Sequence, residues 1–152
     1  MKAIIMYPGA PAPELSERPK PATISKEQVL LQVKAVAIKN LDISKAKGNH
    51  YSSTVNPEGQ IIGTDGVGIT PEGNRVYGVS REGMLAEYSL VDTMFSVPVP
   101  DGLDDASAAA IPNAVMGSAL ALLFRAKMQP GETVLINGAT GVTGRMAIQV
   151  AR

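Results

Sequence analysis

The segment "NGATGVTG" near the end of the chain has the residue types and the spacing of a phosphate-binding turn. Its glycines, Gly138, Gly141 and Gly144, come directly after the apolar run "TVLIN" and directly before a helix-like run. In the dinucleotide fingerprint the three glycine positions fall on Ala139, Gly141 and Gly144, so that alanine replaces the first glycine. At such a turn Gly141 lets the backbone approach a pyrophosphate, and Gly144 lets the helix pack closely.

Backbone N–H groups at the start of the following helix would face the bound anion. We therefore predict a cofactor-binding segment whose members are Gly138, Ala139, Thr140, Gly141, Val142, Thr143 and Gly144. A plain tight turn between a strand and a helix is the alternative interpretation. The order strand, turn, helix favours the binding interpretation.

The composition excludes several other kinds of site and partner. The chain has 152 residues, of which 45% are hydrophobic and 18% charged, and its formal net charge is 0. These values indicate an ordinary globular protein without a nucleic-acid or anionic-membrane surface. Without Cys, disulfides and thiolate metal sites are excluded. The N-terminal apolar run is too short for a signal peptide, and no apolar run approaches a membrane span. We therefore expect a cytoplasmic protein.

The first two-thirds of the chain are strand-like. The predicted strands are "KAIIMY" (2–7), "QVLLQVKAVAI" (28–38), "GQIIGTDGVGIT" (59–70), "NRVYGV" (74–79), "MLAEYSLV" (84–91) and "MFSVPV" (94–99). Gly63, Gly66 and Gly68 suggest bulges or sharp bends in the third of these. The Pro-rich segment 17–28 is predicted to be a loop. The buried face of these strands is expected to include Ile4, Val33, Val36, Ile62, Val76 and Leu85.

The character of the sequence changes after Pro100. The run "DGLDDASAAAIP" is typical of a turn, a capping Asp and a brief helix that Pro112 ends. The run "AVMGSALALLFRAKM" predicts a second, largely buried helix, and "TVLIN" predicts a fully buried strand of a parallel sheet. We place the domain boundary between residues 115 and 116.

The order and spacing of several motifs resemble the medium-chain dehydrogenase/reductase superfamily, and most of all its zinc-free quinone oxidoreductase branch. The motifs are "KAVAIKNLDISKAKG", "IIGTDGVG", "GNRVYG", "GMLAEYSLV", "VPDGLDDASAAAIP" and "QPGETVLINGATGVTG". The resemblance runs along nearly the whole chain.

This resemblance implies a mixed β and α/β fold: a GroES-like β-barrel catalytic domain, here residues 1–115, followed by a Rossmann domain that begins in residues 116–152. It also implies hydride transfer from a nicotinamide cofactor, NADP(H) in preference to NAD(H), to a small-molecule carbonyl or quinone. Family members are often dimers, so a homodimer stays open.

The resemblance also indicates whether a metal is expected and which residues are candidates for catalysis. Zinc-dependent relatives have Cys where Lys39 stands, and His-Glu where Thr64 and Asp65 stand, and lysine is not a zinc ligand at neutral pH. We therefore expect no zinc. His50, the one histidine, is expected to be polar surface.

Asn40 lies in the segment that holds the family's active-site asparagine, and the closest register puts Lys39 on that residue. Asn40 is a candidate catalytic residue and Lys39 a candidate cofactor contact. Tyr51 matches an active-site tyrosine of some relatives and could donate to a carbonyl, or it is an exposed loop aromatic. Ser118 stands where relatives have a Thr that faces the nicotinamide ribose, or it is a small residue that allows close helix packing. Asp42 is expected to be a turn or strand-end cap, with a pairing to Lys45 open.

The ribose-reading residue of a dinucleotide fold comes about 20 positions beyond the fingerprint, which lies past Arg152. The chain is therefore expected to be the first half of an enzyme, inactive alone, as a fragment or one piece of a cleaved protein. A non-catalytic GroES-like binding or scaffold module is the alternative function.

Overall fold

The computed structural model describes residues 1–22, 25–53 and 56–152 of the chain. The chain divides into two compact units, Met1–Ala109 (unit 1) and Ala110–Arg152 (unit 2). Thr23 and Ile24, within the predicted loop 17–28, lie outside the described residues.

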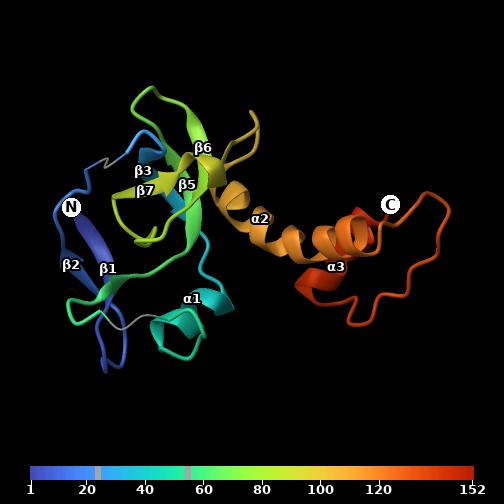
Figure 1. Ribbon diagram of the computed structural model, residues 1–152, viewed down its shortest axis with the longest axis horizontal. Helices are drawn as coiled ribbons and strands as arrows, with labels where there is room; N and C mark the ends of the chain where they lie inside the picture. Colours follow the sequence, from blue (N-terminus) through green and yellow to red (C-terminus); the bar gives the residue numbers. More distant parts are fainter. Residues whose placement is uncertain (23–24, 54–55) are drawn as a thin grey trace. The chain divides into compact units, whose positions relative to one another are not determined.

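Unit 1 is built from two antiparallel sheets (Figure 1). One has the strand order β2-β1-β4 and the other the order β7-β3-β5-β6-β8. The strands are β1 (Lys2–Met6), β2 (Glu14–Glu17), β3 (Gln28–Val36), β4 (Gln60–Ile61), β5 (Asp65–Ile69), β6 (Arg75–Val79), β7 (Tyr88–Asp92) and β8 (Ser96–Pro98). A bridge between Ala3 and Ala86 joins the two sheets. The predicted mixed β and α/β class is confirmed, and the described strands form two joined sheets rather than one closed barrel.

Two apolar clusters make the core of unit 1. The first contains Val67, Val99, Ala108 and Ala109, and the second contains Leu31, Met84 and Val91. Val33, Val36 and Val76, which the sequence placed in the core, are partly buried against the second cluster.

The prediction was wrong about the face of β1. Ala3 and Ile5 are buried, whereas Ile4 is only partly buried. Because successive side chains of a strand point to opposite faces, the inward side is the one next to the predicted residue. Ile62 and Leu85 are likewise only partly buried.

The glycines of the third predicted strand act in different ways. Gly63 has φ +88° and separates β4 from β5, as the predicted bend requires. Gly66 and Gly68 lie inside the continuous strand β5, so a sharp bend there is wrong, whereas the other expectation, a bulge, has a counterpart in a register shift opposite Gly68 and Val67. At Gly66 a Cβ would lie 2.5 Å from the carbonyl oxygen of Ala35, so glycine allows β3 to approach β5 closely. The register shift between these strands lies in β3, between Val33 and Ala35.

Two elements of unit 1 were not predicted. The first is the helix α1 (Asn40–Ala46), and the second is the edge strand β2, which pairs with β1. A 3₁₀ turn, η1 (Thr93–Phe95), also replaces the start of the last predicted strand.

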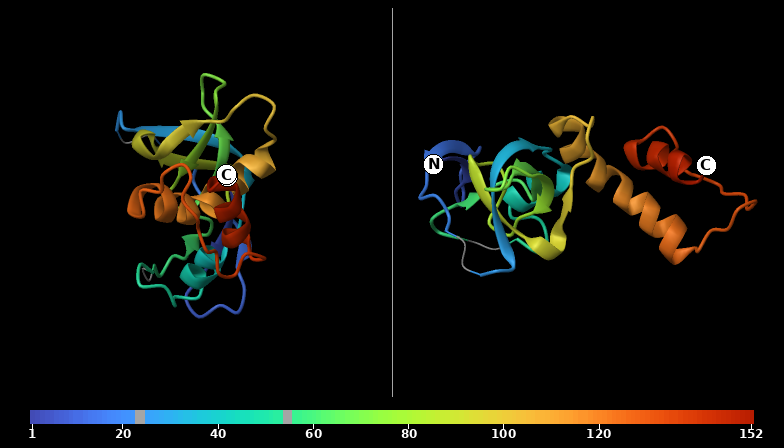
Figure 2. Two further views of the ribbon diagram at one scale, coloured as in Figure 1. Left: turned by 90° about the vertical axis from the view of Figure 1, so that its right-hand side faces the viewer. Right: turned by 90° about the horizontal axis from the view of Figure 1, so that it is seen from above.

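The helix α2 (Asp105–Ala119) runs through Pro112 and continues as the π-helical segment η2 (Leu120–Arg125) (Figure 2). The prediction that Pro112 ends a brief helix is therefore wrong. Proline removes one backbone donor, and the intact turns on both sides of it maintain the helix. The predicted capping Asp is confirmed, because Asp104 Oδ1 accepts from the N–H of Ser107 at 2.9 Å.

The continuous helix changes the expectation that no apolar run approaches the length of a membrane span. Asp105–Arg125 is, by length and composition alone, a helix that could span a membrane, and it is the one such helix among the described residues. The prediction had divided this run at Pro112 into two helices, each too short to span a membrane.

Unit 2 ends in the helix α3 (Val142–Val150). The predicted strand 133–137 does not form, and Leu135 within it is exposed. A strand needs a hydrogen-bonding neighbour, and unit 2 supplies none in the described structure.

Candidate functional site

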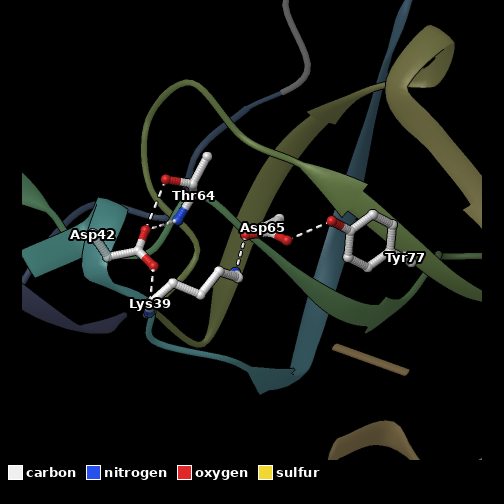
Figure 3. Close-up of polar contacts among 5 residues, drawn as sticks. All are labelled: Lys39, Asp42, Thr64, Asp65 and Tyr77. Carbon is white, nitrogen blue, oxygen red and sulfur yellow. Dashed lines mark hydrogen bonds and ion pairs between the residues drawn. The ribbon is translucent and has the colours of Figure 1, made fainter. Parts of the chain in front are cut away.

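A buried polar cluster joins the start of α1 to strands β5 and β6 (Figure 3). The ammonium group of Lys39 forms an ion pair with Oδ1 of Asp65, and the phenol of Tyr77 donates a hydrogen bond to Oδ2 of the same carboxylate. Asp65 is 2% exposed. A carboxylate so deeply buried requires partners, and here each oxygen has one.

Tyr77 is held in its neutral form. Burial raises the pKa of the Tyr77 phenol, and its hydrogen bond to the Asp65 carboxylate raises that pKa further. The cluster therefore holds an ammonium cation, a carboxylate and a neutral hydroxyl donor in one row.

A second carboxylate, Asp42, bonds the backbone on both sides of this cluster. Its Oδ2 accepts from the backbone N–H of Lys39 at 2.8 Å, which caps the start of α1. Its Oδ1 accepts from the N–H of Thr64 at 2.8 Å and from the Thr64 hydroxyl at 2.7 Å. Asp42 therefore caps the start of a helix, not the turn or strand end that was expected, and no ion pair with Lys45 occurs in the described residues. Asp42 fixes the backbone next to both Lys39 and Asp65.

The other predicted residues of unit 1 lie outside the cluster. Asn40 is the exposed first residue of α1. Tyr51 is 96% exposed, and its ring lies 4.3 Å from that of His50, centroid to centroid. His50 Nδ1 lies 2.8 Å from the hydroxyl of Ser52, as a polar loop residue would. The structure brings Lys39, but neither Asn40 nor Tyr51, into contact with Asp65.

The sequence interpretation missed Asp65 and Tyr77 as members of a site. One signal was present: Asp65 is the only charged residue in the apolar stretch "IIGTDGVGI", and a charge in a buried strand needs a partner. The identity of the partner required the fold.

The predicted cofactor-binding segment, residues 138–144, lies in unit 2, where residues 137–141 form a turn that leads directly into α3. A Cβ at Gly144 would lie 2.3 Å from the carbonyl oxygen of Gly138, so only glycine lets the helix pack against the turn. Gly141 is the N-cap residue, in an extended conformation and without a side-chain cap. The first N–H groups of α3 therefore lack the side-chain acceptor that usually satisfies them, which suits a bound anion.

The remaining residues of the predicted segment line this helix start. Val142 and Thr143 open α3 and are exposed, as is Thr140, whereas Ala139 is partly buried. The buried hydroxyl of Ser118 donates to the carbonyl oxygen of Thr143 at 2.8 Å. Ser118 thus connects α2 to the first turn of α3.

The residues of the buried cluster do not fit a zinc ion. The ammonium group of Lys39 is a cation without a lone pair, and it already neutralises Asp65. Among the described residues, no group of three or more His, Cys, Asp or Glu side chains could hold a metal.

Comparisons with known proteins identify relatives of the chain. It is 31% identical over 140 residues to quinone oxidoreductase-like protein 2 of Mus musculus, covering 86% of this chain and 40% of that protein. It is 34% identical over 150 residues to a type I polyketide synthase of phenolphthiocerol synthesis from Mycobacterium marinum, covering 93% of this chain and 7% of the synthase. No family model matches.

The fold of the chain also matches a solved structure of a quinone oxidoreductase. The quinone oxidoreductase of Thermus thermophilus, which was also solved in complex with NADPH, matches with a TM-score of 0.86 and 35% identity. The match covers 99% of this chain and 50% of that one. The chain spans half or less of the length of these relatives. With the motifs, the two-unit fold and these relatives, the chain belongs to the medium-chain dehydrogenase/reductase superfamily, next to its quinone oxidoreductase-like members.

Proposed function

We propose that the full-length protein is an NAD(P)H-dependent oxidoreductase that transfers a hydride to a quinone or another carbonyl substrate without zinc. The observation that carries the proposal is the start of α3. Its N-cap Gly141 has no side-chain cap, and Gly144 packs the helix closely on the turn. Such a turn holds a pyrophosphate on backbone N–H groups. The relative solved with NADPH favours NADP(H) over NAD(H).

The reaction needs a hydride donor and a proton. The reduced nicotinamide supplies the hydride, and one proton completes the reduction of a quinone to a hydroquinone, with the oxidised nucleotide as the second product. The protein's part is to bind, to orient and to exclude water. Residues that donate hydrogen bonds to the accepting oxygen suffice on the protein side, and Asn40 and Tyr51 are our candidates.

We propose one role for the residues up to 115 and another for those that follow. Residues 1–115 form the catalytic domain, with Lys39 as a cofactor contact, and residues 116–152 begin the dinucleotide-binding domain, with Ser118 at the nicotinamide ribose. We further propose a cytoplasmic protein that acts on a small molecule, without nucleic-acid or membrane partners, and open to forming a homodimer.

The test of cofactor binding is Gly141→Val in the full-length protein. A Cβ at Gly141 would lie 3.5 Å from the nearest atom, the carbonyl oxygen of Gly138, which is an ordinary contact, so the backbone there accepts a Cβ. The branched side chain would stand where the pyrophosphate approaches. We expect NADPH affinity, measured by nicotinamide fluorescence, to fall at least about tenfold, which is about 1.4 kcal/mol.

The matched control is Gly117→Val, the same change at a position of α2 with no atom within 4 Å. It should leave NADPH affinity unchanged. Equal affinities for Gly141→Val and wild type would show that the turn is only a turn, and would favour a binding or scaffold module.

The zinc-free part of the proposal has its own test. Elemental analysis of the purified protein should find no stoichiometric zinc, and a chelator should leave the melting temperature unchanged, because Lys39 and Asp65 neutralise each other. One tightly bound zinc per chain would contradict this part alone.

A further inference from the structure

Unit 1 contains a cavity of about 590 Å³ that the proposed hydride transfer does not use. It lies between helix α1, the loop that follows β1, and strand β4. In Figures 1 and 2 this loop and α1 lie at the same end of unit 1. The volume is within the range of pockets that bind small molecules.

Most of the cavity wall is apolar and partly rigid. Its apolar lining includes Met6, Tyr7, Pro8, Pro11, Ile38 and Ile43. Ile38 and Ile43 are each 46% exposed, so two large apolar side chains of the wall remain in contact with water. Prolines fix part of the loop backbone in advance, which lowers the entropy that a ligand would have to offset. An apolar body suits this wall.

The lining of the cavity has more positive than negative side chains. Lys45 and Lys47 line the cavity, and neither forms an ion pair within residues 1–22, 25–53 and 56–152. The one carboxylate of the lining, Asp42, is already occupied by three hydrogen bonds from Lys39 and Thr64. Asp42 keeps its negative charge, but with two lysines against one carboxylate the lining has a formal charge of +1, which favours an anionic ligand.

We propose that this cavity is a binding site for a small, flat apolar molecule that carries an anionic oxygen, such as an aromatic carboxylate. The apolar body would cover Ile38 and Ile43, and the anionic group would pair with Lys45 or Lys47. The proposal does not rest on the proposed hydride transfer.

The experiment compares two probes on the 152-residue chain. 2-Naphthoate and 2-naphthalenemethanol share the same flat ring system, and only the first carries a negative charge. Calorimetry should show saturable binding of 2-naphthoate at one site, about tenfold tighter than that of the neutral alcohol. No saturable binding of 2-naphthoate, or equal affinity for both probes, would overturn the proposal.

Two pairs of variants locate the binding. Ile43→Glu places a carboxylate at the wall and should weaken 2-naphthoate binding at least about tenfold. Its control is Leu15→Glu, because Leu15 on β2 is 63% exposed and does not line the cavity. Unchanged affinity of folded Ile43→Glu, or equal loss in Leu15→Glu, would place the ligand elsewhere and overturn the proposal.

The second pair keeps the test decisive if Ile43→Glu does not fold. The double variant Lys45→Gln with Lys47→Gln should lose the preference for 2-naphthoate over the alcohol. The control double variant, Lys26→Gln with Lys34→Gln, removes the same charge away from the cavity and should retain the preference. The same preference in both double variants would overturn the proposal.

Discussion

Lys39 stands at the position where zinc-dependent relatives have a Cys ligand. Its ammonium group has no lone pair with which to bind a metal. Both oxygens of Asp65 are engaged, one by Lys39 and one by Tyr77, so the carboxylate is satisfied despite its burial. An ammonium group has three donors, and the pair with Asp65 uses one of them. Lys39 can therefore stay paired and still donate to a second acceptor, as its proposed cofactor contact requires.

At this scale the Tyr77 phenol gives a direct pH prediction. Its pKa is raised, so the neutral form is favoured in the folded protein. The stability that this contributes is fully present below about pH 10, the value of an unfolded tyrosine, and is lost as the pH rises through the higher folded pKa. Subtracting the tyrosinate absorbance of Tyr77→Phe from that of the wild type should leave no titration up to about pH 10.

A component of Tyr77 that ionises at or below about pH 10 in the folded protein would contradict the buried cluster. Chemical denaturation of the two proteins at several pH values gives an independent check. The difference in unfolding free energy between them should be constant below that pH and shrink above it.

Among the elements, α1 depends most on a single side chain. A helix of 7 residues is marginal by itself, and Asp42 both caps its first turn and bonds Thr64 ahead of β5. Asp42→Ala would leave buried donors without an acceptor. We expect it to lower the unfolding free energy by about 2–4 kcal/mol, measured by urea denaturation.

The matched control for this prediction is Asp101→Ala, which removes an exposed aspartate from a turn. It should change stability by less than about 0.5 kcal/mol. An Asp42→Ala protein as stable as the control would mean that α1 is held by its packing instead.

How far the sequence predicts these elements depends on how local their causes are. The alternation of β3, the cap at Asp104 and the glycine turn before α3 all follow from neighbours in the chain, and they are present. The pair of Lys39 and Asp65 could not be predicted from spacing, because 26 positions separate the two residues and strand β5 must first pack beside α1. The strand predicted at 133–137 failed for the same reason, since its formation depends on a neighbouring strand.

On the scale of the whole molecule, the two units differ in how they bury apolar groups. Both units leave large apolar side chains exposed, but the two apolar clusters lie in unit 1, which is the larger, whereas those of the shorter unit 2 belong to neither cluster. The exposed ones in unit 2 are Ile111, Met116, Leu120, Leu123, Phe124, Leu135 and Val142. Exposed apolar groups of this extent tend to acquire partners. We therefore expect residues 110–152 to govern association of the isolated chain.

The last prediction concerns what residues 1–152 can bind alone. We propose that the turn at Gly141 holds a pyrophosphate, and the ribose-reading residue of a dinucleotide fold comes about 20 positions beyond the fingerprint. From Ala139 that position lies past Arg152, so residues 1–152 contain the glycine turn without that residue. Calorimetry of residues 1–152 with NADPH and NADH should show no binding in the low micromolar range, whereas the full-length protein should bind NADPH. Tight binding by residues 1–152 would show that the phosphate turn and unit 1 together suffice, and the proposed division of the cofactor site would be wrong.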